Sequence, residues 1–238
     1  MLVRRCRPYL LALVFGLGAF IGAAPVMPAA AAERLPDCRY DDVLASNAAY
    51  SDWNVTLLDT TFTLRKDYQP PKLVSTSRAG LNGGGSVRSL VIPDLTAMAK
   101  AARNAGAGLR VVSAFRSYSY QQSVYRQEVR RYGESSARLT VARPGHSEHQ
   151  LGVTIDFGSA RDSREGWQYN DWGNTASGAW IRANGWKYGW VMSYPKNRRG
   201  VTCYRYEPWH WRYVGRDVAA RVHDSSLTLR EYLWAQSH

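Results

Sequence analysis

Two short polar motifs, far apart in the chain, place the strongest constraint on its fold. The first is Ser147–Gly152, with the sequence SEHQLG, and Asp156 follows it. The second is Glu207–His210, with the sequence EPWH. Together they offer two imidazoles and one carboxylate, plus a spare carboxylate three positions before His210. Three protein ligands, an open position and a nearby general base make up a catalytic zinc site. We therefore expect the fold to bring both motifs to one point.

The first motif leads into a predicted strand at residues 153–157. Alternation along a strand places Val153 and Ile155 on one face and Asp156 on the other. An acid in an otherwise apolar strand costs free energy unless it is paired or binds a metal. Asp156 is therefore either a metal ligand or the partner of an arginine.

The second motif contains a built-in bend. Glu207 and His210 would face opposite ways on an ideal strand. Pro208, which lies between them, cannot donate to a strand ladder and favours a bend or bulge. Such a bend could turn both side chains toward one metal. Taken alone, the spacing is a weak signal, and Glu207 is equally well read as a surface acid.

The N-terminus has the pattern of an export signal. Arginines occupy three of residues 4–7, Leu10–Ile21 is an apolar run too short to span a bilayer comfortably, and Ala29–Ala32 supplies small residues for cleavage. We expect residues 1–32 to be a signal peptide, with an uncleaved anchor as the alternative. The mature chain should then be secreted, with no stable membrane span.

Charge and cysteine content fit an extracellular protein. Residues 1–32 carry three Arg and no acid, so the net charge falls from +12 to +9 after cleavage. This suits association with an anionic cell wall. Nucleic acid is a poor partner, because the cations are scattered and no nucleic-acid motif occurs. Cys38 and Cys203 remain as an even pair, and we expect a disulfide to the strand before Glu207 rather than two free thiols.

Local periodicity predicts an α+β fold. Helical spacing, such as Leu95, Met98 and Ala102 on one face, alternates irregularly with short strands. We expect helices at 93–103, 118–132, 176–184, 217–223 and 227–235, and strands at 109–115, 153–157, 186–194, 201–206 and 209–214. Regular βαβ units are lacking, so we expect a single domain with a central antiparallel sheet flanked by helices. Residues 33–72 should be an N-terminal segment that wraps this domain.

Three ordered motifs carry a family resemblance. Ser113–Tyr118, Ser147–Gly152 with Asp156, and Glu207–Gly215 resemble the motifs of bacterial D-alanyl-D-alanine carboxypeptidases. These are VanY-like zinc peptidases, whose fold is shared with D-Ala-D-Ala dipeptidases and hedgehog-type domains. The resemblance runs from about Leu73 to Gly215 and implies a catalytic domain at 73–238.

The resemblance also implies a role for each motif position. It implies one Zn²⁺ ion bound by His149, Asp156 and His210. It implies that Glu207 is the general base and acid, acting on a zinc-bound water, and that Arg116 stabilises the oxyanion. Ser147 and Gln121 match positions near the substrate, and Trp209 is a further candidate for the substrate groove.

The expected activity is removal of the terminal D-Ala from a peptidoglycan stem peptide by an exported, cell-wall-associated enzyme. Two alternatives stay open. The first is an endopeptidase that cuts an L,D bond or a cross-link, because groove length is not visible in the sequence. The second is a non-catalytic wall-binding module, although the intact set of ligands and Glu207 argues against this.

Overall fold

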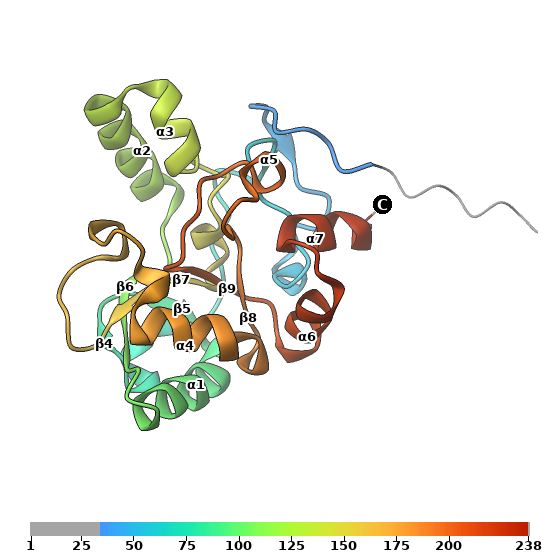
Figure 1. Ribbon diagram of the computed structural model, residues 1–238. Helices are drawn as coiled ribbons and strands as arrows, with labels where there is room; N and C mark the ends of the chain where they lie inside the picture. Colours follow the sequence, from blue (N-terminus) through green and yellow to red (C-terminus); the bar gives the residue numbers. More distant parts are fainter. Residues whose placement is uncertain (1–33, 238) are drawn as a thin grey trace, which may run out of the picture. The chain divides into compact units, whose positions relative to one another are not determined.

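A five-stranded sheet lies at the centre of the part of the chain that the computed structural model describes, residues 34–237 (Figure 1). Its strand order is β4-β6-β7-β9-β8. These strands are β4 (Asn82–Gly83), β6 (Leu109–Ser113), β7 (Thr154–Ser159), β8 (Trp190–Met192) and β9 (His210–Tyr213). Two small pairs lie outside this sheet: β1 (Val43–Leu44) with β2 (Phe62–Thr63), and β3 (Leu73–Ser75) with β5 (Ser86–Arg88). The expected signal peptide, 1–32, falls outside the described residues.

The sheet is antiparallel except at one edge. β7 pairs antiparallel with β6 and β9, and β9 pairs antiparallel with β8. The edge strand β4 runs parallel to β6, a departure from the fully antiparallel sheet that the sequence predicted. On the inner pair, Asp156 of β7 lies directly opposite His210 of β9. The register of two central strands therefore brings together residues from both polar motifs.

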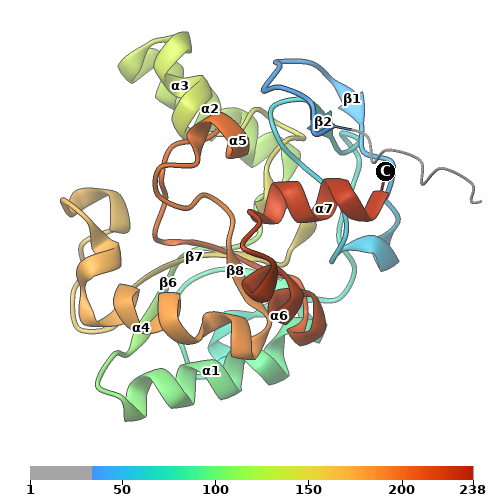
Figure 2. The ribbon, with the colours of Figure 1, turned by 45° about the vertical axis from the view of Figure 1, so that its right-hand side comes forward.

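Helices flank the sheet, and the expected α+β fold is confirmed. Helices α1 and α4 lie beside each other and next to the sheet in both views (Figures 1 and 2). Helices α2 and α3 form a separate pair, and α6 and α7 follow β9. The helices are α1 (Ile92–Asn104), α2 (Tyr118–Tyr132), α3 (Glu134–Thr140), α4 (Ala176–Asn184), α5 (Arg199–Thr202), α6 (Arg216–Ser225) and α7 (Leu229–Ser237).

One face of β7 builds the core, and the other faces the polar cluster described below. Ile155 and Phe157 are fully buried and belong to one apolar cluster with Leu95 and Met98 of α1 and Ile181 of α4. Burial of each such side chain contributes about 1.5–3 kcal/mol. The alternating strand residues, among them Asp156, point to the other face, as the sequence pattern indicated.

The strand predicted at 201–206 is wrong. This segment starts in the short helix α5 and continues through Cys203, whose φ is 70°. A left-handed residue turns the chain and is incompatible with an extended strand. The strand predicted at 186–194 shrinks to β8, because Gly185–Tyr188 forms a 3₁₀ turn. Helix α3 was not predicted.

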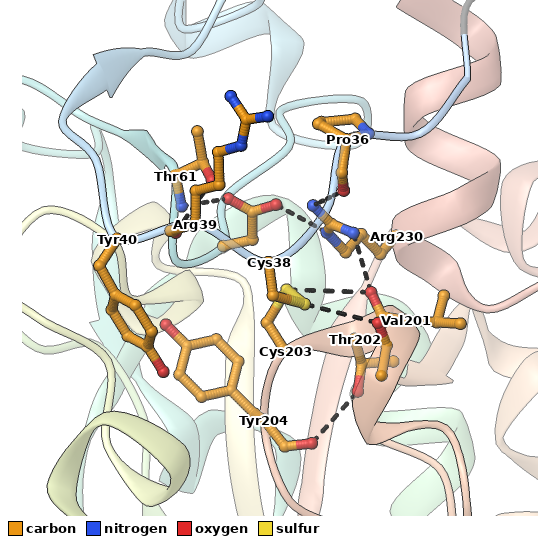
Figure 3. Close-up of a disulfide and its surroundings, with 12 residues drawn as sticks. Pro36, Cys38, Arg39, Tyr40, Thr61, Val201, Thr202, Cys203, Tyr204 and Arg230 are labelled. Carbon is orange, nitrogen blue, oxygen red and sulfur yellow. Dashed lines mark hydrogen bonds and ion pairs between the residues drawn. A yellow bond between two sulfur atoms is a disulfide. The ribbon is translucent and has the colours of Figure 1, made fainter. Parts of the chain in front are cut away.

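A disulfide joins Cys38 to Cys203, with Cα atoms 5.4 Å apart (Figure 3). The bridge therefore anchors the N-terminal segment to the C-terminal end of α5, and not to a strand. Arg230 of α7 lies beside it and donates to the carbonyl oxygens of Pro36 and Val201 at 3.0 and 2.9 Å. The N-terminus of the described chain is thus fixed from two sides.

Further contacts hold the N-terminal segment to the rest of the described residues. Two side chains contact Asp59. Nδ1 of the buried His146 lies 2.7 Å from its carbonyl oxygen, and Nε of Arg230 lies 2.6 Å from its carboxylate. Arg212 donates to the carbonyl oxygen of Trp53 at 2.9 Å. Residues 34–237 all belong to one compact unit. None of the helices within them is both long enough and apolar enough to cross a bilayer.

Candidate metal centre and active site

Three side chains from the two polar motifs meet at one buried point. His149, Asp156 and His210 each offer one ligand atom, and these atoms lie within 4.8 Å of one another. All three residues are less than 5% exposed. The structure thus assembles the ligand set that the sequence motifs indicated.

His149 is fixed by a tight turn. It lies in the 3₁₀ turn Glu148–Leu151, which Gly152 ends in a left-handed conformation before β7 begins. Nδ1 of His149 lies 2.7 Å from the carbonyl oxygen of Ala114. Since a carbonyl only accepts, Nδ1 carries the proton and Nε2 is left with its lone pair. That Nε2 faces Oδ2 of Asp156 at 3.2 Å.

Burial and the nearby Arg116 keep the His149 ring neutral, against the opposing effect of Asp156. Burial lowers the pKa of His149, and the nearby Arg116 guanidinium lowers it further, to about 4. A neutral imidazole is the form that binds a metal. The ring therefore needs no deprotonation before it can act as a ligand at neutral pH.

Asp156 and His210 face each other across the central strands. Nδ1 of His210 lies 3.0 Å from Oδ1 of Asp156. Burial alone would raise the pKa of Asp156, but His149, His210 and Arg116 hold it well below its usual range. Burial alone would lower the pKa of His210, but its hydrogen bonds to Asp156 and Glu148 raise it to about 10.

Glu207 reaches the same point through a turn. The His210 N–H donates to the Glu207 carbonyl at 3.1 Å, which closes a turn around Pro208. This is the bend that the proline suggested. Oε2 of Glu207 lies 3.9 Å from Nδ1 of His210, and the side chain is 14% exposed. Burial raises the pKa of Glu207 to about 8, against the opposing effect of His210. A carboxyl with this pKa and some access to solvent is suited to proton transfer near neutral pH.

Arg116 contacts the ligand set directly. Its Nη2 lies 2.6 Å from Oδ2 of Asp156, so Asp156 is both a candidate ligand and an arginine partner. Its Nε donates to Ser113 Oγ at 2.8 Å, and its Nη1 to Gln121 Oε1 at 3.5 Å. Gln121 is itself fully buried, and its Nε2 donates to the Ala142 carbonyl at 2.8 Å. In this structure Gln121 supports the arginine.

The other two predicted substrate residues occupy different surroundings. Ser147 is buried and precedes the turn that carries His149. The ring of Trp209 is partly buried and packs against Gly166, where an added Cβ would come within 2.6 Å of it. Trp167, which is half exposed, lies edge-on to Trp209 with ring centres 5.9 Å apart. A role in substrate binding remains a prediction for both residues.

Sequence reasoning missed Glu148. This carboxylate is buried and bonds to His210, Arg212 and Ser193 at 2.9, 2.9 and 2.6 Å. The available signal was its place inside the SEHQLG motif, immediately before a candidate ligand. Periodicity could not show that Glu148 would reach His210 while the next residue, His149, reaches Asp156.

The three candidate ligands lie close enough to share one metal ion. Nε2 of His149 lies 3.2 Å from Oδ2 of Asp156, and Nδ1 of His210 lies 3.0 Å from Oδ1. The atoms that the three residues offer all lie within 4.8 Å of one another. Two imidazoles and one carboxylate, buried and facing inward, therefore fit a divalent ion such as zinc.

This combination defines a class of site. In this α+β fold, a partly exposed carboxylate lies beside a buried group of two histidines and one aspartate. That is the arrangement of a metal-dependent hydrolase. The chain belongs to the VanY family of D-alanyl-D-alanine carboxypeptidases, whose family model matches residues 85–216.

Individual relatives agree with this assignment. YodJ of Bacillus subtilis (strain 168), named provisionally as a carboxypeptidase, is 42% identical over 147 residues, covering 61% of this chain and 53% of its own. A D-alanyl-D-alanine carboxypeptidase of Enterococcus faecalis (strain ATCC 700802 / V583) is 31% identical over 162 residues, covering 64% and 58%. The chain thus spans about half the length of the curated relatives it matches.

Solved structures of two activities resemble this fold. The LD-carboxypeptidase LdcB is 37% identical with a TM-score of 0.65, covering 74% of this chain and 83% of its own. A variant of the vancomycin resistance D,D-pentapeptidase VanY, in complex with Zn(II), is 27% identical with a TM-score of 0.65, covering 76% and 99%.

Proposed function

We propose that this protein is an exported, zinc-dependent D,D-carboxypeptidase that removes the terminal D-Ala from peptidoglycan stem peptides. The observation that carries the proposal is the buried group of His149, Asp156 and His210 with Glu207 beside it. The family and the D,D-pentapeptidase neighbour support the choice of substrate.

The proposed ligands are Nε2 of His149, the carboxylate of Asp156 and Nδ1 of His210. The neighbour solved with Zn(II) supports zinc as the ion. When bound, zinc supplies Lewis acidity toward the scissile carbonyl and lowers the pKa of a coordinated water toward about 7. Nδ1 of His210 must lose its proton for this, so we expect proton release on metal binding.

Glu207 is the proposed general base and acid. It would take a proton from the attacking water and return it to the departing amine. Its position suits this role, since the turn at Pro208 holds the carboxylate beside the ligand set and leaves it partly open to solvent. Free D-Ala and a stem peptide shortened by one residue would be the products.

Arg116 is the proposed oxyanion-stabilising residue. Nη2 is committed to Asp156, and Nη1 makes only a long contact of 3.5 Å with Gln121. A guanidinium held on two sides in this way keeps its charge and a fixed orientation. A weakly engaged donor on such a group is available to an oxygen that gains negative charge.

A second candidate is an L,D-carboxypeptidase, which would remove D-Ala after an L-centre. The specific observation in its favour is the 37% identity to LdcB, higher than the 27% identity to the VanY variant. Both reactions use the same proposed chemistry at the metal. They differ in the configuration of the residue that precedes the scissile bond.

The proposal is tested with two matched peptides. The purified protein is incubated with zinc and a stem pentapeptide ending in D-Ala-D-Ala, and separately with the tetrapeptide ending in an L-amino acid followed by D-Ala. Mass spectrometry then identifies the products. Loss of one D-Ala from the pentapeptide alone supports the D,D assignment, and loss from the tetrapeptide alone supports the second candidate. Cleavage of neither peptide, with zinc bound, overturns both.

Export and wall association form a separate part of the proposal. They rest on the segment 1–32 and on the net charge of +9 that remains after its removal. Purified sacculi provide the test, because soluble products can be separated from the wall. Released D-Ala indicates the proposed activity, cleaved cross-links or internal cleavage of stem peptides indicate an endopeptidase, and retention on the wall without products indicates a binding module.

A further inference from the structure

Glu148 occupies the position behind His210, on the far side of the ring from Asp156. Nδ1 of His210 faces Asp156 at 3.0 Å, whereas Nε2 faces Oε2 of Glu148 at 2.9 Å. Both carboxylates are less than 5% exposed. Each nitrogen of the His210 ring therefore lies within hydrogen-bond distance of a different buried carboxylate.

Both oxygens of Glu148 accept hydrogen bonds. Oε1 accepts from Nη1 of Arg212 at 2.9 Å, and Oε2 accepts from Ser193 Oγ at 2.6 Å as well as from His210. Arg212 lies two positions after His210 on β9, so both side chains project from the same face. One carboxylate thus bridges two neighbouring positions of the strand that carries a ligand.

Glu148 is also tied to the other histidine of the site. It is the first residue of the turn Glu148–Leu151, and the candidate ligand His149 is the second. The carbonyl of Glu148 accepts from the hydroxyl of Thr154 at 3.1 Å, which fixes this turn against β7. A single turn therefore supplies one ligand directly and supports a second ligand from behind.

We propose that Glu148 is a positioning residue for the metal ligand His210. Its carboxylate accepts a hydrogen bond from the protonated Nε2, which leaves the Nδ1 lone pair to face the ion. A carboxylate behind a ligating imidazole fixes the ring tautomer and orientation, and loss of such a partner typically weakens metal affinity 10–100-fold. The inference rests on the proposed function only in taking zinc as the ion.

The donors around this residue explain why a carboxylate is needed. Ser193, His210 and Arg212 all donate, and an ionised carboxylate accepts from all of them with two oxygens. A glutamine in the same place has one accepting oxygen, and its amide turns two further donors toward the cluster. Glu148→Gln therefore keeps the shape of the side chain but leaves either His210 or Arg212 without an accepting oxygen.

The test compares Glu148→Gln with Ser193→Ala. The serine change removes one hydrogen bond to Glu148 and keeps the carboxylate that faces His210, so it is the matched control. Zinc dissociation constants are measured on metal-free protein by competition with a chelator. We expect a 10–100-fold weaker constant for Glu148→Gln and a change below about 3-fold for Ser193→Ala. Equal zinc affinity in Glu148→Gln and the wild type, with only the melting temperature lowered, overturns the proposal.

A measurement on the unaltered protein keeps the inference testable if the variant does not fold. Ring ¹⁵N NMR of zinc-loaded wild-type protein distinguishes the two nitrogens of His210. We expect a protonated Nε2 and a metal-bound Nδ1. Zinc on Nε2 overturns the proposal. These readouts are independent of peptide cleavage, so an inactive protein that binds zinc as expected would contradict the proposed function and leave this inference intact.

Discussion

The carbonyl oxygen of Ala114 lies 2.7 Å from Nδ1 of His149, so the residue that follows β6 sets the tautomer of a candidate metal ligand. β6 is the strand next to β7 on the side away from β9. All three inner strands therefore help to position the candidate ligands. β7 and β9 carry two candidate ligands at opposing positions, and the residue just after β6 orients the candidate ligand that comes from the turn.

Zinc should stabilise the fold. A ligand that binds only the native state at 100 times its dissociation constant adds about 2.7 kcal/mol, which corresponds to a rise in melting temperature of roughly 5–10 °C for a chain of this size. Thermal unfolding with zinc, and again after chelation, measures the effect. His149→Gln should abolish the rise, and an undiminished rise in that variant would show that the ion binds elsewhere.

Glu207→Gln should separate chemistry from metal binding. Loss of a general base typically lowers the rate 10²–10⁴-fold, and Glu207 stands 3.9 Å from the nearest ligand nitrogen without being one of the proposed ligands. We expect kcat for D-Ala release to fall by that factor while one zinc per chain is retained. Full activity of this variant would contradict the assigned role, and loss of the metal would make Glu207 a ligand instead.

The start of α7 should contribute stability that depends on pH. Thr228 and Glu231 form a reciprocal cap, in which the Thr228 N–H donates to Glu231 Oε2 at 2.7 Å and the Glu231 N–H donates to Thr228 Oγ1 at 3.3 Å. Arg198 adds an ion pair at 2.7 Å. Burial alone would raise the pKa of Glu231, but the bonds from Thr228 and Arg198 lower it below its usual value.

The sign of this effect follows from the lowered pKa. The ionised carboxylate stabilises the native state above the unfolded pKa of about 4.3, and this contribution is lost as the pH falls through the lower native pKa. Glu231→Gln can keep the cap bond to the Thr228 N–H but loses the charge, so it should cost about 0.2–1 kcal/mol at pH 7 and progressively less below about pH 4. Urea unfolding of both proteins at several pH values measures the difference. A difference that stays constant down to pH 2 would refute the ionic part of the cap.

The disulfide should be a large single contribution to stability. The bridge closes a loop with a sequence separation of 165, and loss of a native disulfide typically costs about 2–5 kcal/mol. We expect Cys38→Ser, Cys203→Ser and the double variant to unfold at similarly reduced denaturant concentrations. Reductant should lower the midpoint of the wild type and leave the double variant unchanged. Equal midpoints for the wild type with and without reductant would rule out this contribution.

Much of the fold was predictable because local patterns there agree with the global structure. The helix expected at 118–132 has the observed bounds, since Ser117 caps its start and Gly133 ends it. The strand carrying Asp156 was predictable from alternation, because one of its faces enters the core and the other does not. In both places the residue pattern along the chain agrees with the structure that the segment adopts.

The errors arise where distant contacts override local preference. The apolar and β-branched residues of 201–206 favour a strand, but the segment begins in α5 and turns at the left-handed Cys203, which is bridged to Cys38. The parallel edge strand β4 contains Gly83, at which a side chain would clash with the Val111 carbonyl. No local pattern reveals such a close approach of two backbones.

The grouping of the three candidate ligands was predictable from the sequence, and the residues that support them were not. The motifs named His149, Asp156 and His210, which the structure brings together. They did not indicate Glu148 as the partner of His210. That contact depends on how a turn is seated against β9 and not on any spacing along the chain.

The pairing of Asp156 with His210 also limits how this sequence can change. A strand presents alternate residues to opposite sides, so inserting or deleting one residue in β7 or β9 would send one ligand of the pair into the apolar layer. Length variation among related chains should therefore accumulate in the connections between strands, and insertions meant to alter substrate choice belong there too.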